Sequence, residues 1–141
     1  MDAVIVTTKE QLEDAYTVRR TVFIEEQGVP EEIEIDSHEK DSIHFVVYDG
    51  DLAVGAGRLR FVDGYGKAER VCVMKEYRKK GVGYLLMKKM EEKALGEGKH
   101  ELKLNAQTHA EAFYNRIGYE TVSDLFYDAG IPHVAMKKEL N

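Results

Sequence analysis

The sequence predicts an α+β fold built around one mixed, mostly antiparallel sheet that helices flank. Two hairpin signals, Asp49-Gly50 and Asp63-Gly64, each stand between runs of strand-forming residues and predict three consecutive antiparallel strands. Stretches with apolar residues at helical spacing precede and follow these strands. The elements read β-α-β-β-β-α-β-α-β-β, and no linker or repeat divides residues 1–141, so we expect a single domain.

The first half of the chain supplies a strand, a helix and the three hairpin-linked strands. The run Val4–Val6 is a short strand candidate. Thr8 and Gln11 stand in capping-box spacing, and the helix that they begin is expected to end at Gly28-Val29-Pro30. The acidic stretch that follows, residues 31–41, is expected to be an exposed loop. The three strands are expected at residues 43–49, 52–62 and 67–74.

The second half begins with a helix that starts at a pair of glycines and stops at Gly96. Within the strand expected at 52–62, Gly55 and Gly57 predict a bulge or a close approach of another backbone. The remaining elements are expected to be a strand at 101–107, a short helix at 110–119, and strands at about 120–127 and 133–138.

Composition restricts the function classes. Hydrophobic residues make up 43% of the chain and charged residues 33%, as in a globular protein with an apolar core. The net charge of −6 argues against general nucleic-acid binding, which needs a broad basic face. No apolar run reaches the roughly 20 residues of a membrane span, and the first residues do not read as a signal peptide. Cys72 is the only cysteine, which is typical of a reducing compartment, so we expect a cytoplasmic protein without a membrane partner.

A basic, glycine-containing turn stands out against this acidic background. In "YRKKGVGYLLM", residues 77–87, three cations precede Gly-Val-Gly and an apolar helix. The first turn of a helix leaves backbone N–H groups unpaired, and glycines let an anion approach them. The run lacks the Gly-Lys-Ser/Thr of a nucleotide P-loop and the third glycine of the dinucleotide fingerprint, so it favours a pyrophosphate held without metal. The alternative is an ordinary exposed cationic turn with a glycine cap.

Further motifs follow this turn in a fixed order. They are "LNAQ" on the next expected strand and "AEAFYNRIGY" on the next helix, after "VCVMKEYRKKGVGYLLM". Together they resemble the GNAT superfamily of acetyl-CoA-dependent N-acetyltransferases, over nearly the whole chain. The end segments "VRRTVFIEEQGVP" and "DAGIPHVAM" resemble its bacterial YjcF/ElaA-like subgroup. The resemblance implies a sheet that splays between the strands near 67–74 and 101–107.

The resemblance also implies where acetyl-CoA binds as co-substrate. Its pyrophosphate is expected on the turn that begins at Arg78, and its pantetheine arm along the preceding strand, like an added β-strand. Asn105 matches the polar residue of the family's splayed strand. The expected cofactor-binding residues are Val71, Cys72, Val73, Arg78, Lys79, Lys80, Gly81, Val82, Gly83, Tyr84, Asn105 and Phe113.

Direct transfer needs an unprotonated amine and a proton for the departing thiolate. An alkyl amine has a pKa near roughly 10.4 and a thiol near roughly 8.5, so a base is useful and a phenol can serve as the acid. Tyr114 matches the family's tyrosine acid; a packed helix tyrosine is the alternative. Glu69 and Glu26 are candidate bases, and each is otherwise a solvated carboxylate. Deprotonation through ordered water would need no dedicated base.

Other reactive side chains have plainer interpretations. His44 and His133 lie in or beside strands, where a structural hydrogen-bonding role is more common than catalysis. Cys72 is favoured as a buried small hydrophobe over an acyl-accepting nucleophile. Arg58 and Arg60 are expected to pair with surplus carboxylates rather than bind an acidic acceptor. Four possible metal ligands lie close together in the sequence: Asp36, His38, Asp41 and His44. Their spacing matches no standard metal site, so no metal is expected.

The leading hypothesis is therefore an N-acetyltransferase that moves acetyl from acetyl-CoA directly to a primary amine. A non-catalytic acyl-CoA-binding or sensing module is the alternative, and nucleotide binding without CoA is a third possibility. The acidic segment 25–41 and eight tyrosines hint at a cationic acceptor, either a small molecule or a peptide amine. We expect no nucleic-acid partner, and a monomer or homodimer.

Overall fold

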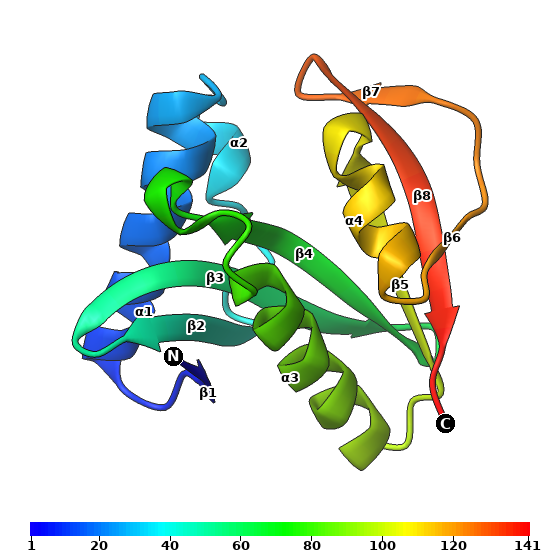
Figure 1. The fold of residues 1–141 in the computed structure, drawn as a ribbon, viewed down its shortest axis with the longest axis horizontal. Helices are drawn as coiled ribbons and strands as arrows, with labels where there is room; N and C mark the ends of the chain where they lie inside the picture. Colours follow the sequence, from blue (N-terminus) through cyan, green and yellow to red (C-terminus); the bar gives the residue numbers. More distant parts are fainter.

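The computed structural model describes residues 1–141 and has one sheet with helices on both of its faces (Figure 1). The strands are β1 (Asp2–Ile5), β2 (Ile43–Asp49), β3 (Leu52–Val62), β4 (Tyr65–Val73), β5 (Glu101–Gln107), β6 (Glu120–Thr121), β7 (Phe126–Asp128) and β8 (Ile131–Glu139). Their order is β1-β2-β3-β4-β5-β8-β6, with β7 also paired to β8. Only β4 and β5 pair in parallel, so the predicted mixed, mostly antiparallel α+β fold is confirmed.

The two hairpins form where the Asp-Gly pairs predicted them. Both loops between β2, β3 and β4 have two residues. Asp63 and Gly64 have φ values of 46° and 88°, the left-handed conformation that a tight hairpin turn requires at both central positions. One expected strand is wrong: residues 120–127 form two short strands, β6 and β7, which pair with successive parts of β8.

The first helix is capped as its sequence predicts and then changes its winding. The Thr8 side chain accepts a hydrogen bond from the Gln11 N–H at 3.1 Å, and Gln11 Oε1 accepts one from the Thr8 N–H at 3.2 Å. Helix α1 (Lys9–Arg19) continues as a π-helical stretch, η1 (Arg20–Glu26), which the spacing of apolar residues does not reveal. Gly28, at φ +74°, ends it. Such widened turns are common at functional sites, and η1 borders the site described below.

The acidic segment after this helix is not an exposed loop, contrary to the sequence-based expectation. It forms the short helix α2 (Glu31–Glu34) and then returns over the sheet. The side chains of Glu34 and Glu39 are 1% and 9% exposed, because they bind the buried guanidinium of Arg19, which is 0% exposed. Buried cations on α1 and β3 therefore draw these carboxylates inward, where ion pairing stabilises their charge.

Helix α3 (Val82–Gly96) covers the face of the sheet opposite α1. An added Cβ at Gly55 would lie 2.6 Å from Val82 Cγ1, and one at Gly57 would lie 2.6 Å from Met90 Cε. Both glycines thus allow α3 to approach the strand closely, through side chains rather than through the backbone that the sequence suggested. The short elements η2 (Lys75–Tyr77), η3 (Thr108–Ala110) and α4 (Glu111–Arg116) complete the fold. No helix combines the length and apolar character that crossing a bilayer would require.

The sheet opens between β4 and β5. These strands pair only through Gly66–Ala68 and Leu102–Leu104, and beyond those residues they diverge (Figure 1). On its other side, β4 shifts register against β3 between Ala56 and Arg58. Arg70 lies at this bulge with φ +56°. The predicted splay is thereby confirmed, and the bulge turns the β4 backbone at the mouth of the opening.

Candidate active site

The largest cavity at the splay is a groove of about 800 Å³, which we call the cofactor groove. It lies between the end of β4, the start of α3, helix α4 and the end of η1. Most residues expected to bind the cofactor or act in catalysis meet there: Glu26, Val71, Cys72, Val73, Arg78, Lys79, Gly81, Val82, Gly83, Phe113 and Tyr114. The structure therefore assembles one groove from residues that the sequence places on four separate elements.

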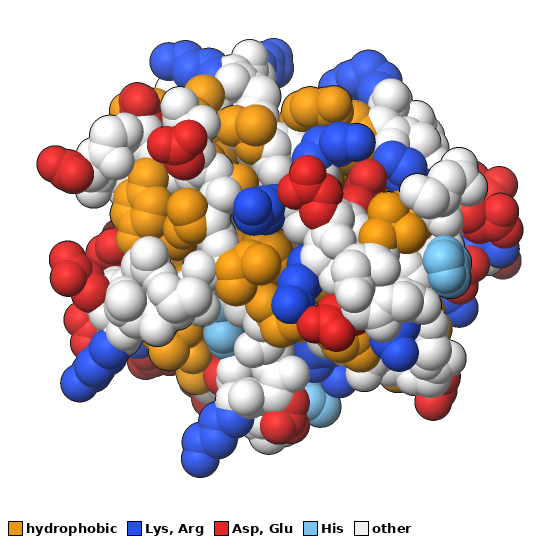
Figure 2. All heavy atoms as spheres, turned by 90° about the horizontal axis from the view of Figure 1, so that it is seen from below, with side chains coloured by type: hydrophobic (Ala, Val, Ile, Leu, Met, Phe, Trp, Pro, Cys, Tyr) orange, Lys and Arg blue, Asp and Glu red, His pale blue; other side chains and the backbone are white.

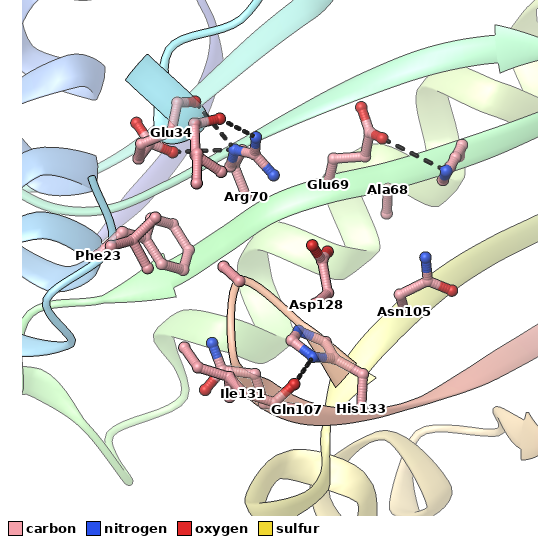
Figure 3. Close-up of a pocket in the computed structure, with 14 residues that line it drawn as sticks. Phe23, Glu34, Ala68, Glu69, Arg70, Asn105, Gln107, Asp128, Ile131 and His133 are labelled. Atoms are coloured by element: carbon pink, nitrogen blue, oxygen red, sulfur yellow. Dashed lines mark hydrogen bonds and ion pairs between the residues drawn. The ribbon is translucent and has the colours of Figure 1, made fainter. Parts of the chain in front are cut away.

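A second cavity, of about 190 Å³, lies on the far side of the splay; we call it the acceptor cavity. Its walls come from η1, α2, β4, β5 and the β7–β8 turn (Figure 3). Its lining residues include Phe23, Ile33, Glu34, Glu69, Arg70, Asn105, Gln107, Asp128 and His133.

A third cavity, a gap of about 80 Å³ between β4 and β5, lies between the two. It shares Val71 and Tyr114 with the cofactor groove and Glu69 and Asn105 with the acceptor cavity. The three cavities are thus neighbours that share lining residues, in sequence from the start of α3 to the β7–β8 turn. A group held at one end can meet a group held at the other.

The start of α3 has the features of an anion cradle. Gly81 is the residue before the helix, with φ +85°, and no side chain caps the first turn. The backbone N–H groups of the first turn of α3 are consequently available to bind an anionic ligand. Lys79, at φ +63°, helps to turn the chain. Lys80 and Tyr84 do not line the groove: the Lys80 ammonium lies 5.3 Å from the Tyr77 ring centre, and Tyr84 is 48% exposed.

Arg78 does not stand free in the groove. Its Nη1 and Nη2 each donate a 2.7 Å hydrogen bond to the Glu26 carboxylate, and its Nε donates to the Val73 carbonyl at 3.1 Å. These hydrogen bonds from Arg78 lower the pKa of Glu26. Glu26 is therefore a weaker proton acceptor than an isolated glutamate, which reduces its suitability as a general base.

Tyr114 is buried where the cofactor groove meets the gap. Its ring packs edge-on against Phe113 and Tyr119, with centroid distances of 5.0 and 5.8 Å. Burial raises the pKa of the Tyr114 phenol, so it stays protonated. Its hydroxyl makes no hydrogen bond within the protein, whereas the Tyr119 hydroxyl donates to Glu91 at 2.9 Å. Of these two tyrosines, only Tyr114 has a hydroxyl that is free to act on a ligand.

Cys72 has the character of a core residue. It is 5% exposed, packs among the apolar residues between α1 and the sheet, and its thiol donates to the Ala56 carbonyl at 3.7 Å. Burial raises the pKa of the thiol to about 12. A thiol in that environment is a poor nucleophile, in agreement with the interpretation as a buried hydrophobe.

Glu69 lies at the entrance of the gap and is held by cations. Arg58 Nε and Arg60 Nε donate to its Oε1 at 3.1 and 2.8 Å, and Lys67 Nζ lies 3.6 Å from Oε2. Burial alone would raise the pKa of this carboxyl, but the hydrogen bond from Arg60 and the surrounding cations outweigh it and lower the pKa. The expectation that both arginines pair with carboxylates is thus confirmed, and Glu69 is poorly suited to accept a proton.

Charge on the acceptor side is mostly neutralised within the protein. Arg70 Nε lies 2.9 Å from Glu34 Oε2 and also donates to the Glu34 carbonyl at 3.1 Å (Figure 3). Among the carboxylates that line the acceptor cavity, Glu34 and Glu69 are ion-paired and Asp128 is not. Asp128 therefore supplies the uncompensated negative charge of this cavity.

His44 lies outside the three cavities, and the acidic and histidine residues around it form no metal site. The His44 Nε2 lies 2.8 Å from the Glu39 carbonyl, and the residue lines none of the three cavities. Asp36 is bound to Arg58 at 2.8 Å, and no set of three or more His, Cys, Asp or Glu side chains is positioned to hold a metal ion. On the face shown in Figure 2, acidic and basic side chains are interspersed.

The chain matches the acetyltransferase (GNAT) domain family over residues 5–140. It is 53% identical to YjcF of Bacillus subtilis, an uncharacterized N-acetyltransferase, over 99% of this chain and 100% of that protein. The crystal structure of Escherichia coli ElaA superposes with a TM-score of 0.86 at 26% identity, covering 98% of this chain and 99% of the other. An acyl-CoA N-acyltransferase from Pseudomonas aeruginosa superposes at 0.85 with 25% identity, covering 98% and 99%.

The fold and the family define the class of the protein as N-acyltransferase. More particularly, the chain belongs to the GNAT acetyltransferase family, and it is similar to YjcF and ElaA, as its end segments suggested.

Several lining residues were not singled out from the sequence. Phe23, Gln27, Arg70, Gln107 and Asp128 come from elements whose tertiary placement no local pattern encodes. The "DAG" turn between β7 and β8 carried the one available signal, since a short turn beside a site is a common place for functional side chains.

Proposed function

We propose that this protein transfers an acetyl group from acetyl-CoA directly to a small primary amine. The observation that carries this proposal is the succession of three adjoining cavities across the splay, with Tyr114 lining both the cofactor groove and the gap. A thioester laid along Val71–Val73 from the cofactor groove would present its carbonyl at the gap. An amine in the acceptor cavity would approach that carbonyl from the other side.

The proposed step needs no covalent enzyme intermediate. The neutral amine nitrogen attacks the thioester carbon, the carbon–sulfur bond breaks, and the thiolate takes the Tyr114 phenol proton. The proton that the nitrogen loses as the amide forms restores the phenol. The raised pKa of Tyr114 favours the protonated form that this role requires. Burial and the raised pKa of Cys72 support direct transfer over an acyl-cysteine route.

The cradle at the start of α3 supports binding of the acetyl-CoA pyrophosphate. The uncapped N–H groups of α3 and the Arg78 guanidinium would bind the pyrophosphate, since both favour anions. Asn105 lies on the diverging part of β5, and its side-chain amide is free to hydrogen-bond the pantetheine arm or the incoming amine. We expect the Asn105→Ala variant to lose acetyl-CoA use more than stability.

The acceptor cavity favours a primary amine attached to an apolar group. Asp128 offers an unpaired carboxylate for the ammonium, while Phe23, Ile33 and Ile131 provide apolar wall. The volume of about 190 Å³ suits a ring or a short chain rather than a large oligosaccharide.

The test is acceptor-dependent thiol release. Wild-type protein with acetyl-CoA is assayed for free CoA in the presence of benzylamine, 2-phenylethylamine, spermidine and a blocked lysine peptide. We expect release well above the amine-free rate with at least one of them. Binding of acetyl-CoA with no release above background from any amine would instead indicate a sensor.

A further inference from the structure

His133, on β8, lies on the same face of the sheet as the polar residues of the acceptor cavity. It pairs directly with Gln107 across the β5–β8 ladder, and Asn105 is two residues before Gln107 on the same strand. Residues opposite one another in a ladder, and residues two apart in a strand, project to one face. All three side chains line the acceptor cavity (Figure 3).

The hydrogen bonding of His133 fixes which of its nitrogens is available. Nδ1 lies 2.7 Å from the Ile131 carbonyl oxygen, which can only accept a hydrogen bond, so Nδ1 carries the proton. In the neutral ring, Nε2 is then the nitrogen with the free lone pair. Nε2 makes no hydrogen bond to the protein although the residue is only 8% exposed.

The ring is also held in place. It stacks on Phe126 with a centroid distance of 5.9 Å and an interplanar angle of 21°. Phe126 is its direct partner in the β7–β8 ladder. A ring fixed by stacking on one side and by a hydrogen bond at Nδ1 keeps Nε2 in one position, which general base catalysis requires.

The two candidate bases predicted from the sequence are occupied. The Glu69 carboxylate is bound by Arg58 and Arg60, and that of Glu26 by Arg78. From these observations we infer that His133 Nε2 is the general base that takes the proton from the acceptor amine. This inference rests on the proposed function and names the base of the same site.

The proton balance is complete within the site. His133 Nε2 takes one proton from the ammonium and so frees the nitrogen lone pair. The nitrogen then forms its bond to the thioester carbon, and the second proton that it loses as the amide forms replaces the one that Tyr114 donates. The carbon–sulfur bond then breaks and the thiolate takes the proton of Tyr114. Afterwards the imidazolium returns its proton to solvent through the open end of the acceptor cavity, and the phenolate is reprotonated.

The experiment compares wild type with His133→Asn, because the Asn amide can still donate to the Ile131 carbonyl. At pH 7 each protein is assayed with benzylamine, an alkyl amine that is mostly protonated, and with aniline, which is neutral and needs no base before attack. We expect kcat/KM for benzylamine to fall by about 100-fold or more and that for aniline by less than tenfold. Added imidazole should restore turnover of benzylamine by His133→Ala.

Three outcomes would overturn the assignment. If the His133→Asn variant turns over benzylamine at the wild-type rate, His133 is not the general base. Equal losses for both amines, without imidazole rescue, would make His133 a structural residue. Absence of amine-dependent CoA release from the wild type itself would overturn the transferase proposal and this inference together. The first two outcomes leave release by the wild type intact, so they overturn the base assignment alone.

Discussion

The Glu26 carboxylate holds the Arg78 guanidinium by two parallel hydrogen bonds of 2.7 Å, at the edge of the groove where an anion is expected to bind. Both side chains are about one-third exposed, at 35% and 38%. Ion pairs with that exposure typically contribute about 0.2–1 kcal/mol. A pyrophosphate can therefore displace Glu26 from Arg78 at small cost.

This relationship predicts that the Glu26→Gln substitution tightens acetyl-CoA binding. Removing the carboxylate frees Arg78 and removes a like charge from the pyrophosphate site. We expect the dissociation constant, measured by calorimetry at low salt, to fall by about 1.4- to 5-fold. Glu25→Gln, at the neighbouring exposed carboxylate, is the control and should leave it unchanged. Weaker binding by Glu26→Gln would mean that Glu26 supports the site rather than competes for it.

The cradle at the start of α3 predicts a charge-specific loss of binding. Gly81 and Gly98 flank the two ends of α3, both have positive φ (85° and 78°), and both face open space. Gly81→Asp and Gly98→Asp thus impose similar backbone strain, but only the first places a carboxylate at the anion site. We expect Gly81→Asp to abolish the thermal stabilisation by acetyl-CoA and Gly98→Asp to keep it.

The neutral variant Gly81→Asn separates charge from strain, since it should retain part of that stabilisation. Equal responses of the Gly81→Asp and Gly98→Asp proteins to acetyl-CoA would show that the pyrophosphate binds elsewhere.

The buried position of Arg58 predicts that its substitution strongly lowers the stability of the fold. Its guanidinium is 1% exposed and lies within 3.1 Å of the carboxylates of Asp36, Glu39 and Glu69. Arg58→Met removes the buried cation that these three carboxylates share and leaves each with fewer cationic partners, so we expect the free energy of unfolding in urea to fall by about 3–5 kcal/mol. Arg20→Met breaks an exposed pair at 3.7 Å and should cost less than about 1 kcal/mol. Similar losses for the two variants would contradict this ranking.

The buried ion pairs that Arg19 and Arg58 form with carboxylates predict that the fold loses stability in acid. Burial alone would raise the pKa of Glu39, but hydrogen bonds from Arg19 and the nearby cations outweigh it and lower the pKa to about 2. A carboxyl with a pKa depressed by folding contributes stability that is present above the unfolded value of about 4.3 and lost as the pH falls toward 2. Urea midpoints should therefore be level from pH 7 to about 5 and decline below that.

Glu39→Gln should flatten this decline, and Glu92→Gln, at an exposed carboxylate without an ion pair, should not. A urea midpoint that stays constant down to pH 2.5 in the wild type would refute the assignment of this acid sensitivity to the buried ion pairs.

Local patterns predicted most of the fold, because hairpin turns, caps and glycine starts are encoded within a few residues. The strands at 43–49, 52–62 and 101–107 have the predicted bounds. The acidic segment was misjudged because charge alone indicates exposure, while the cations that bury Glu34 and Glu39 lie on distant elements.

The site, like the fold, has parts that local sequence patterns predict and parts that depend on tertiary contacts. The cradle and Tyr114 are recognisable from motifs, since each lies in a short continuous stretch. The base role that we infer for His133 could not be predicted, because it rests on the Nδ1 hydrogen bond to Ile131 and on the cations that occupy Glu69. Those contacts exist only after β4, β5 and β8 come together.

The central claim is that Tyr114 protonates the thiolate as acetyl passes through the gap. Tyr114→Phe keeps the ring that packs against Phe113 and Tyr119 and removes only the hydroxyl. Tyr119→Phe is the matched control, because it removes a hydroxyl that is bound to Glu91. The Tyr119→Phe substitution should lower the melting temperature and leave the rate of CoA release unchanged.

The measurement is the single-turnover rate of CoA release with a saturating amine, alongside the dissociation constant for acetyl-CoA and the melting temperature. General acid catalysis typically contributes about 10²–10⁴ in rate. We predict that Tyr114→Phe slows release by at least about tenfold while affinity and melting temperature stay at wild-type values. Release from Tyr114→Phe at the wild-type rate would contradict the account.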